Sequence, residues 1–156
     1  MPTFRNTAEI QFYLEKIMRD VMREDVIPVI VNEWLEVQDE RVYNSYSPFE
    51  YERRGSTGGL ADPNNIQVSE HKVNSVSSFV LENITKGNGW DNWNGKLIND
   101  LIEGADGFAG NPANGMPARP YTEEAVANLK SGVSRNELLH AIEKGFAKRG
   151  ININIK

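Results

Sequence analysis

Apolar residues near the N-terminus recur at steps of three and four, which is the period of an α-helix. They are Ile10, Tyr13, Leu14, Ile17, Met18 and Val21. Side chains at this spacing gather on one face of a helix. The pattern therefore predicts an amphipathic helix that begins at Asn6 or Thr7.

Pro28 interrupts the helical pattern. Asp25 is able to cap a new helix just ahead of it, because its carboxylate accepts the N–H groups that a first turn leaves free. An approximately helical stripe then continues through Ile27, Ile30, Val31, Trp34, Leu35 and Val37. The sequence predicts either one kinked helix or two abutting helices.

The polar positions of this region are mostly acidic. They include Glu9, Glu15, Asp20, Glu24, Glu33, Glu36, Asp39 and Glu40, which outnumber Lys16, Arg19, Arg23 and Arg41. We interpret them as a solvated acidic face. Over the whole chain, 22 acidic residues against 17 basic ones give a formal net charge of −5, which argues against a protein built to coat nucleic acid.

The middle of the chain changes character. Proline, glycine and asparagine break any regular period between Tyr43 and Asn65, so this segment is predicted to be a long loop that carries aromatic residues. From Ile66 to Thr85 the period shifts toward two, which is typical of strands. Two antiparallel strands with a turn near Asn74-Ser75 fit this pattern.

A short helix and a second loop follow. The apolar spacing after Trp90 and Trp93 predicts a helix that ends at Gly104. The stretch from Asp106 to Pro117 contains too much glycine, proline and asparagine to pack regularly. It is predicted to be a loop that becomes ordered on assembly.

Two further helices and a tail complete the chain. Thr122 is placed to cap the first helix, and Ser134 with Glu137 has the spacing of a capping box for the second, which ends near Gly150. The tail Ile151–Lys156 alternates apolar and polar residues strictly, so it is predicted to be a terminal strand with one buried face. Such a strand needs a sheet edge, in this chain or in a neighbouring one.

Length and element order together indicate the fold class. A chain of 156 residues fits about one domain of roughly 150 residues, and no repeat or linker divides it. The order helix, strands, helix, helix, strand predicts an α+β fold, with helices packed on a small antiparallel sheet beside long glycine-rich loops. One domain over residues 1–156 is expected. The apolar runs are too short for a membrane span and the start lacks the layout of a signal peptide, so a cytosolic product is the default.

Residues able to carry out catalysis are few. The chain has no cysteine, so disulfides and thiol nucleophiles are excluded. His71 and His140 have no nucleophile motif beside them, and the ligand spacings of zinc and calcium sites do not occur. Asp62, Glu70 and His71 form the one cluster from which a metal-dependent hydrolase is conceivable. We expect no enzyme activity, no cofactor and no metal.

Arg53 and Arg54 lie among aromatic residues and form the strongest candidate for a recognition surface. Guanidinium groups beside aromatic rings bind phosphate or stack on bases, and the same residue types are enriched in protein–protein contacts. The aromatic neighbours are Tyr46, Phe49 and Tyr51. The acidic remainder of the chain favours protein partners, and a nucleic-acid-binding module is the alternative.

Several short motifs occur in a fixed order along the chain. They are Tyr51-Glu-Arg53-Arg54-Gly55, Gly58-Gly59-Leu60-Ala61-Asp62, Asn65-Ile66, Leu101-Ile102-Glu103-Gly104, and the turn Ala118-Arg119-Pro120-Tyr121 before a terminal helix. In this order they resemble the head–tail joining proteins of tailed bacteriophages, and more narrowly their neck or tail-completion proteins. The resemblance covers most of the chain from about Tyr43 onward.

The resemblance implies a non-enzymatic virion protein, made in the host cytoplasm and assembled as a ring where the head meets the tail. Its partners would be copies of itself, the neighbouring head-connector and tail proteins, and double-stranded DNA that passes without sequence-specific binding. Loops rich in Tyr, Arg and Trp suit contacts between ring subunits, and acidic helices suit a channel wall that repels phosphates. The interface candidates are then Tyr46, Phe49, Tyr51, Arg53, Arg54, Gly58, Gly59, Asp62, Arg119 and Tyr121.

Overall fold

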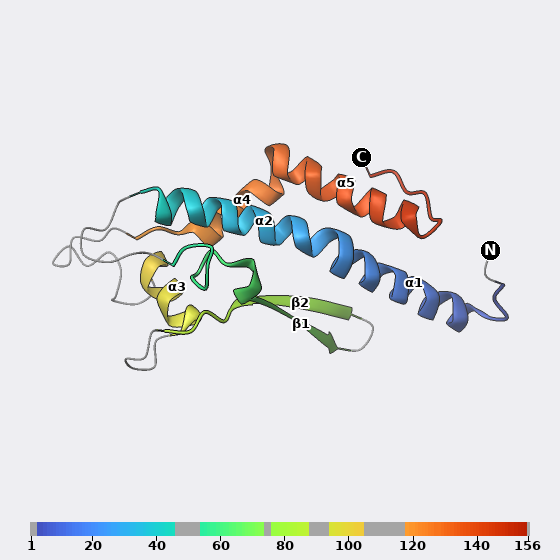
Figure 1. The fold of residues 1–156 in the computed structure, drawn as a ribbon. Helices are drawn as coiled ribbons and strands as arrows, with labels where there is room; N and C mark the ends of the chain where they lie inside the picture. The colour runs from blue at the N-terminus through green and yellow to red at the C-terminus, as the bar shows by residue number, and fades with distance from the viewer. Residues whose placement is uncertain (1–2, 46–53, 74–75, 88–93, 105–117, 156) are drawn as a thin grey trace. The chain divides into compact units, whose positions relative to one another are not determined.

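The structure, a computed structural model, describes residues 3–45, 54–73, 76–87, 94–104 and 118–155. Within them lie five α-helices and one antiparallel pair of strands, which confirms the predicted α+β class (Figure 1). The chain divides into two compact units. The first consists of residues 1–32 and 128–156, and the second of residues 33–127. The expectation of a single domain over residues 1–156 stays a prediction.

The N-terminal helix begins where the sequence predicts it. Helix α1 spans Thr7–Val21, and the Oδ1 atom of Asn6 accepts a hydrogen bond from the N–H of Glu9 at 2.9 Å. This bond satisfies one of the N–H groups that the first turn of a helix leaves without a partner. The side chain of Asn6 therefore fixes the start of the helix.

The backbone stays helical past Pro28. A π-helical turn, Met22–Val26, joins α1 to α2, which spans Ile27–Gln38, and a second π-helical turn follows at Asp39–Tyr43. A proline inside a helix removes an N–H donor, and its ring presses on the carbonyl four residues earlier. A wider turn directly ahead of Pro28 relieves this crowding. Asp25 lies inside that wider turn, so the prediction that it caps a new helix is wrong.

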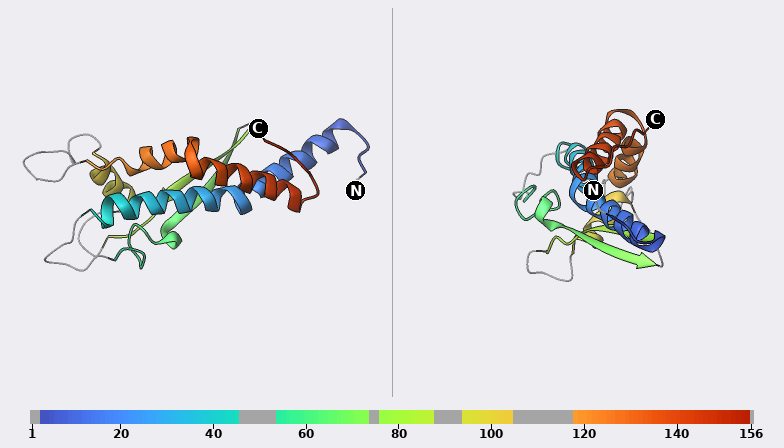
Figure 2. Two further views of the ribbon diagram at one scale, coloured as in Figure 1. Left: turned by 90° about the horizontal axis from the view of Figure 1, so that it is seen from above. Right: turned by 90° about the vertical axis from the view of Figure 1, so that its right-hand side faces the viewer.

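The core of the first unit lies between the N-terminal helix and α5, which spans Gly132–Lys148 (Figures 1 and 2). Its buried residues are Ile17, Val21 and Val26, and Leu138, Ile142 and Phe146 of α5 pack against them. A Cβ atom at Gly145 would lie 2.8 Å from Cγ1 of Val21 and 2.8 Å from Oδ2 of Asp25. Glycine at this position therefore allows the two helices to approach closely.

Helix α5 ends where the sequence predicts, but it begins earlier than predicted. The helix begins at Gly132, so Ser134 lies inside its first turn and the predicted capping box of Ser134 and Glu137 is wrong. At the other end, Gly150 adopts a φ of +78°, a left-handed conformation that follows helix ends readily only in glycine. The predicted end of this helix is confirmed.

The tail after α5 does not form a strand. Residues 151–155 pair with no strand in the part of the chain that the structure describes. The N–H of Ile151 donates to the carbonyl of Phe146 at 3.0 Å, and the N–H of Ile155 donates to Oε1 of Glu143 at 2.9 Å. The predicted terminal strand is therefore wrong for the chain by itself. Its alternation favours a strand, but the sheet belongs to the second unit, and groups of α5 accept the tail's hydrogen bonds instead.

Two antiparallel strands form a hairpin in the second unit. Strand β1 spans Ile66–Val73 and strand β2 spans Val76–Asn83, with Val68 opposite Leu81. The predicted pair of strands is confirmed. The predicted turn at Asn74-Ser75 lies outside the described residues.

The two faces of the hairpin differ in exposure. Opposite residues of an antiparallel pair lie on the same face, so Val68, Phe79 and Leu81 share one face, on which they are half-buried. Val73, Val76 and Val80 share the other face, which we call the open face, and they are 69%, 68% and 40% exposed. The alternation read from the sequence thus holds, with valines on the exposed side.

The core of the second unit forms where the end of α2 meets α4, which spans Tyr121–Lys130. Its buried residues are Val37, Val42, Tyr121 and Ala125, with Trp34, Tyr43 and Ile102 packed against them. The rings of Trp34 and Tyr121 stack with their centroids 6.4 Å apart. Glu33 is buried, so it does not belong to the solvated acidic face predicted for this helix.

Helix α3 spans Gly95–Glu103 and ends as predicted, because Gly104 takes up a left-handed conformation with φ +92°. Helix α4 begins at Tyr121, so Thr122 lies in its first turn. The prediction that Thr122 caps this helix is wrong. Its N–H and its hydroxyl both bind the carboxylate of Glu103 instead.

Candidate functional site

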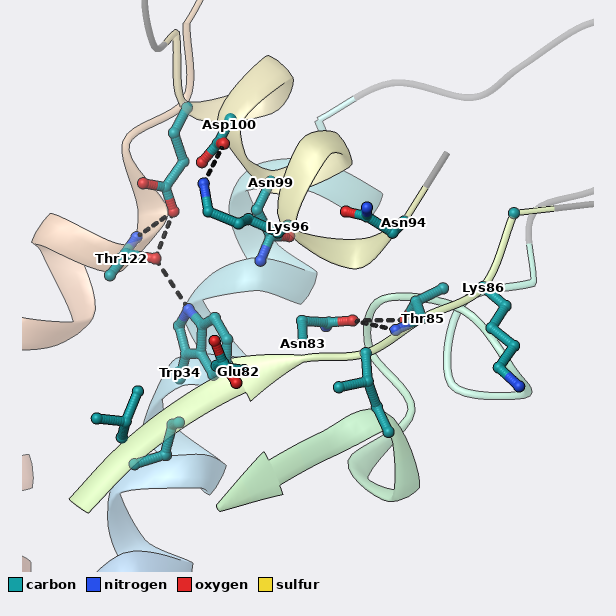
Figure 3. A pocket seen from close by; sticks show the side chains of 15 residues that line it. Trp34, Glu82, Asn83, Thr85, Lys86, Asn94, Lys96, Asn99, Asp100 and Thr122 are labelled. Atoms are coloured by element: carbon teal, nitrogen blue, oxygen red, sulfur yellow. Dashed lines mark hydrogen bonds and ion pairs between the residues drawn. The ribbon is translucent and has the colours of Figure 1, made fainter. Parts of the chain in front are cut away.

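A groove of about 950 Å³ lies between β2 and α3 in the second unit (Figure 3). The consecutive residues 80–87 line it, and Lys96, Asn99 and Asp100 of α3 line it from another side. Trp34 of α2 and Thr122 of α4 also contribute. Four separate elements therefore form the groove, and no short sequence motif predicts it.

A chain of hydrogen bonds fixes the indole ring beside the groove. The Nε1–H of Trp34 donates to the hydroxyl of Thr122 at 3.0 Å, and that hydroxyl donates to the carboxylate of Glu103. The N–H of Thr122 donates to the same carboxylate at 3.2 Å. Glu103 therefore ties the end of α3 to the start of α4 and orients Trp34 through Thr122.

Tyr121, an interface candidate from the sequence, is fully buried. Its hydroxyl donates to Oδ1 of Asn99 at 2.6 Å and accepts from Nε2 of Gln38 at 3.2 Å. Burial, reinforced by the negative charge of Glu103, raises the pKa of the Tyr121 hydroxyl above its ordinary value. The side chain is thus a neutral part of the core and offers no exposed contact.

The glycine-rich loop before β1 is held by its own polar groups. The carboxylate of Asp62 accepts from the N–H of Gly58 at 2.7 Å and from the N–H of Asn64 at 2.9 Å. These backbone hydrogen bonds lower the pKa of Asp62. A Cβ atom at Gly59 would lie 2.4 Å from the carbonyl oxygen of Gly55, so only glycine fits there. Gly58, Gly59 and Asp62 therefore act together in shaping the loop.

The same loop is fastened to the segment that follows β2. Thr85 donates its hydroxyl to the carbonyl of Gly59 at 3.0 Å, and Nδ2 of Asn83 donates to the carbonyl of Leu60 at 2.8 Å. Nη2 of Arg54 donates to the carbonyl of Lys86 at 2.9 Å. Asn83 and Thr85 are buried, and the sequence did not single them out. The sequence signal that could have indicated these two residues is the Asn-x-Thr pair Asn83-Ile84-Thr85 at the end of the predicted strand.

The structure brings only part of the predicted recognition surface into view. Arg119 is half-buried, and its N–H donates to the carbonyl of Ile102 at 2.8 Å. Tyr46, Phe49, Tyr51, Arg53, Trp90, Trp93 and residues 106–117 lie outside the described residues. Of the two arginines at the centre of the predicted surface, Arg54 thus has a defined role, which is to hold the glycine-rich loop.

The cluster of Asp62, Glu70 and His71 was considered for a metal-dependent hydrolase. Among the described residues, no group of three or more His, Asp or Glu side chains is arranged to hold a metal ion. Nε2 of His71 instead lies 3.4 Å from the hydroxyl of Ser69, two residues along the exposed strand. The two carboxylates and the imidazole therefore do not form one site.

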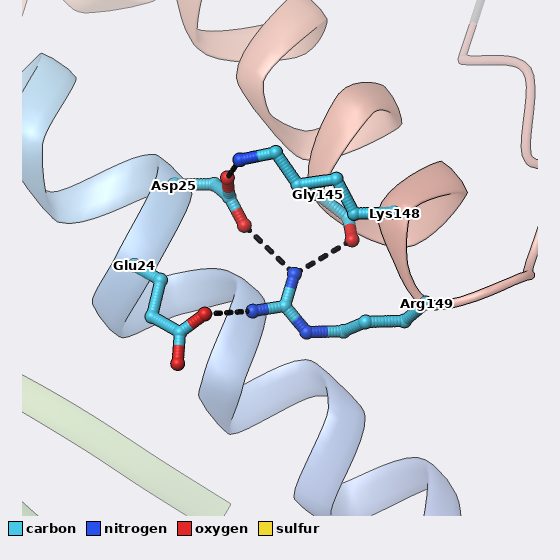
Figure 4. Close-up of polar contacts among 5 residues, drawn as sticks. All are labelled: Glu24, Asp25, Gly145, Lys148 and Arg149. Atoms are coloured by element: carbon cyan, nitrogen blue, oxygen red, sulfur yellow. Dashed lines mark hydrogen bonds and ion pairs between the residues drawn. The ribbon is translucent and has the colours of Figure 1, made fainter.

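A second polar cluster joins the two ends of the first unit (Figure 4). Arg149 donates to Asp25 at 2.8 Å, to Glu24 at 2.5 Å and to the carbonyl of Gly145 at 2.7 Å. Lys148 also pairs with Asp25. The Asp25 side chain is 5% exposed and that of Arg149 is 16% exposed, so water screens this pair poorly.

The ionisation of Asp25 reflects this setting. Burial by itself would raise the pKa of Asp25, but the hydrogen bonds and positive charges of Lys148 and Arg149 outweigh burial and lower it. The carboxylate therefore stays charged and holds the π-helical turn Met22–Val26 to the end of α5. We infer that this cluster stabilises the first unit and does not form a catalytic site.

Comparison with known protein families identifies a related family. The family model described as YomN matches residues 6–148, and this family is phage-derived, from the SPbeta prophage. Neither the curated proteins nor the solved structures contain a match. No helix in the described ranges has the length and apolar character to cross a membrane.

Proposed function

Because the chain belongs to the phage-derived YomN family, we propose that it is a structural, non-enzymatic component of a phage particle. More specifically, it forms a ring at the junction of head and tail, as a neck or tail-completion protein. Its partners are copies of itself and the neighbouring head-connector and tail proteins. It is made in the host cytoplasm and ends up in the virion.

The observation that carries this proposal is the exposed hairpin. An isolated two-stranded sheet is marginally stable in water, and its unpaired edges invite another chain to pair. Here the hairpin also exposes three valines on its open face, Val73, Val76 and Val80. A surface of this kind suits a subunit that buries it against neighbours in an assembly.

The place at the head–tail junction is supported by the resemblance of the chain's motifs to neck and tail-completion proteins. A ring subunit contacts two neighbours through two different surfaces, which suits a chain with two separate compact units. The formal net charge of −5 suits a wall past which DNA slides without sticking.

Quantitative mass spectrometry of purified particles tests the proposal. Particles of the phage that encodes the chain would be purified and digested, and the copy number of the chain measured against the major capsid protein. We expect a small, fixed number of copies per particle, equal to the number of subunits in the ring. Absence of the chain from complete particles would exclude a structural role.

A further inference from the structure

Strand β2 has an edge that no strand covers in the part of the chain that the structure describes. The N–H of Ile84 donates to the carbonyl of Asn65 at 2.8 Å, in continuation of the β1–β2 register. In an antiparallel ladder, residues whose backbone groups face the partner strand alternate with residues whose groups face away. The backbone N–H and C=O groups of Ser77, Phe79 and Leu81 therefore point away from β1.

The groove lies at the end of this edge. A groove over the face of a strand would be lined by every second residue, because successive side chains point to opposite faces. Here the consecutive residues 80–83 all line it, and no residue of β1 does. Figure 3 shows the lining residues of α3 on the side of β2 away from β1. The groove thus leaves space beside the edge at Leu81, toward the end of β2, and does not include Ser77 or Phe79.

The same chain carries a segment with the pattern of a strand and no strand partner. Residues 151–155 alternate isoleucine and asparagine, and β-branched residues at alternate positions are typical of a strand with one buried face. Ile153, at the centre of the segment, is 36% exposed. Five residues is also close to the typical length of about five to six residues for a strand in a sheet.

We propose that residues 151–155 of one copy of the chain pair, as a third strand, with the free edge of β2 in a neighbouring copy. The inference rests on the assembly of copies in the proposed function and adds how they are joined. In the chain by itself Ile151 packs against the core of the first unit and α5 accepts the hydrogen bonds of Ile151 and Ile155, so the pairing replaces these contacts. The isoleucines would then lie beside Phe79 and Leu81 on the half-buried face, because that face buries their apolar surface. The asparagines would then lie on the open face of the hairpin.

This pairing joins two different surfaces, the tail of one copy and the hairpin of the next. Each copy therefore offers one tail and one edge, and the contact repeats from subunit to subunit. Such heterologous contacts close into a ring when the rotation between subunits allows it. The backbone ladder supplies affinity, and the alternate side chains supply register.

Cross-linking of the full-length chain tests the pairing, since the native sequence has no cysteine. One isotope-labelled population would carry Asn154→Cys and a second, unlabelled population Ser78→Cys or Val80→Cys on the open face. After mixing and mild oxidation, mass spectrometry would identify disulfides between labelled and unlabelled chains. We expect several-fold more of this mixed dimer than with Ser77→Cys, which is also exposed but lies on the other face.

Equal yields at Ser77→Cys and Ser78→Cys, or no mixed dimer at any position, would overturn the proposal. A further chain that carries both Asn154→Cys and Ser78→Cys would overturn it as well if its disulfides formed only within the chain, because the tail would then pair with its own hairpin. Ile153→Pro removes a ladder N–H and should abolish the mixed dimer, whereas Ile153→Val should preserve it. If the mixed dimer forms but the chain is absent from phage particles, the pairing stands and the proposed function fails.

Discussion

Asp25 and Arg149 lie 124 positions apart in the sequence, and their side chains meet at 2.8 Å. Asp25 belongs to the turn ahead of Pro28, and Arg149 follows the last helix. The ion pair therefore connects the beginning and the end of the chain within the first unit. Lys148, the last residue of α5, and Arg149 directly after it both pair with this carboxylate, and both also lie at the negative end of the helix dipole.

Replacing Arg149 by alanine should destabilise the first unit. The substitution removes three hydrogen bonds and leaves the buried carboxylate of Asp25 with Lys148 as its remaining partner. We expect the free energy of unfolding to fall by about 2 kcal/mol. Urea unfolding followed by far-UV circular dichroism measures it. Lys96→Ala is the control, because the pair of Lys96 with Asp100 is exposed and should contribute little. An equal effect of both substitutions would contradict the assignment.

The contribution of Asp25 to stability should depend on pH in the acidic range. Its pKa is lowered in the folded chain from an ordinary value of 3.8. A lowered pKa means that the stabilisation is fully present above the unfolded value and is lost as the pH falls through the folded value. The difference in stability between the native chain and Asp25→Asn should therefore shrink below about pH 4. Urea midpoints measured across this range test it, and a difference that stays constant would exclude the mechanism.

Close helix contact at Gly145 should make even a methyl group costly. In Gly145→Ala the new Cβ would lie 2.8 Å from Val21 and from Asp25, so the helices must separate or the Asp25 carboxylate must move. We expect a loss of about 1–3 kcal/mol, although alanine favours helices more than glycine does. Asn136→Ala, at an exposed position of the same helix, should not destabilise. A stabilised Gly145→Ala chain would show that the contact is looser than described.

Local signals account for the parts of the fold that the sequence predicts correctly. Gly104 and Gly150 end helices because their left-handed conformation follows from residue type alone. The hairpin follows from alternation on both sides of a polar turn. Errors arise where a side chain has two possible partners. Asp25 is suited to a helix cap, but it binds residues more than a hundred positions away, and no local pattern indicates them.

The candidate site is predicted less well for the same reason. Tyr121 belongs to the turn Ala118-Arg119-Pro120-Tyr121, which the family resemblance places among the interface candidates, yet its ring packs on Trp34 from a distant helix. The groove combines β2, α3, α2 and α4, so its existence depends on tertiary packing. For the tail, the local pattern is clear and the tertiary partner is missing. Residues 151–155 have the alternation of a strand, but a strand also needs a sheet edge, and the described part of the first unit contains no sheet.

Removal of one hydroxyl at Tyr121 should destabilise the second unit without disturbing its packing. Tyr121→Phe preserves the stacking on Trp34 but leaves Oδ1 of Asn99 and Nε2 of Gln38 without their shared partner. We expect a loss of about 1–2 kcal/mol. All three tryptophans lie in residues 33–127, so the change in tryptophan fluorescence during urea unfolding reports on this unit. Tyr13→Phe, in the first unit, should leave that transition unchanged, and a matching shift would contradict a local role of the hydroxyl.

The exposed valines at the end of the hairpin should matter for assembly and not for folding. Val73 and Val76 lie opposite each other and are 69% and 68% exposed, so the isolated chain gains little from them. Replacing both by threonine keeps the β-branched shape that strands favour and removes apolar surface. We expect the stability to change by less than about 0.5 kcal/mol per substitution, as is usual at the surface.

Incorporation into phage particles, measured by the copy number of the chain, should fall several-fold. Val133→Thr is the matched control, because Val133 is 74% exposed on α5, outside the hairpin. Unchanged incorporation of the doubly substituted chain would show that the open face of the hairpin is not buried in the particle.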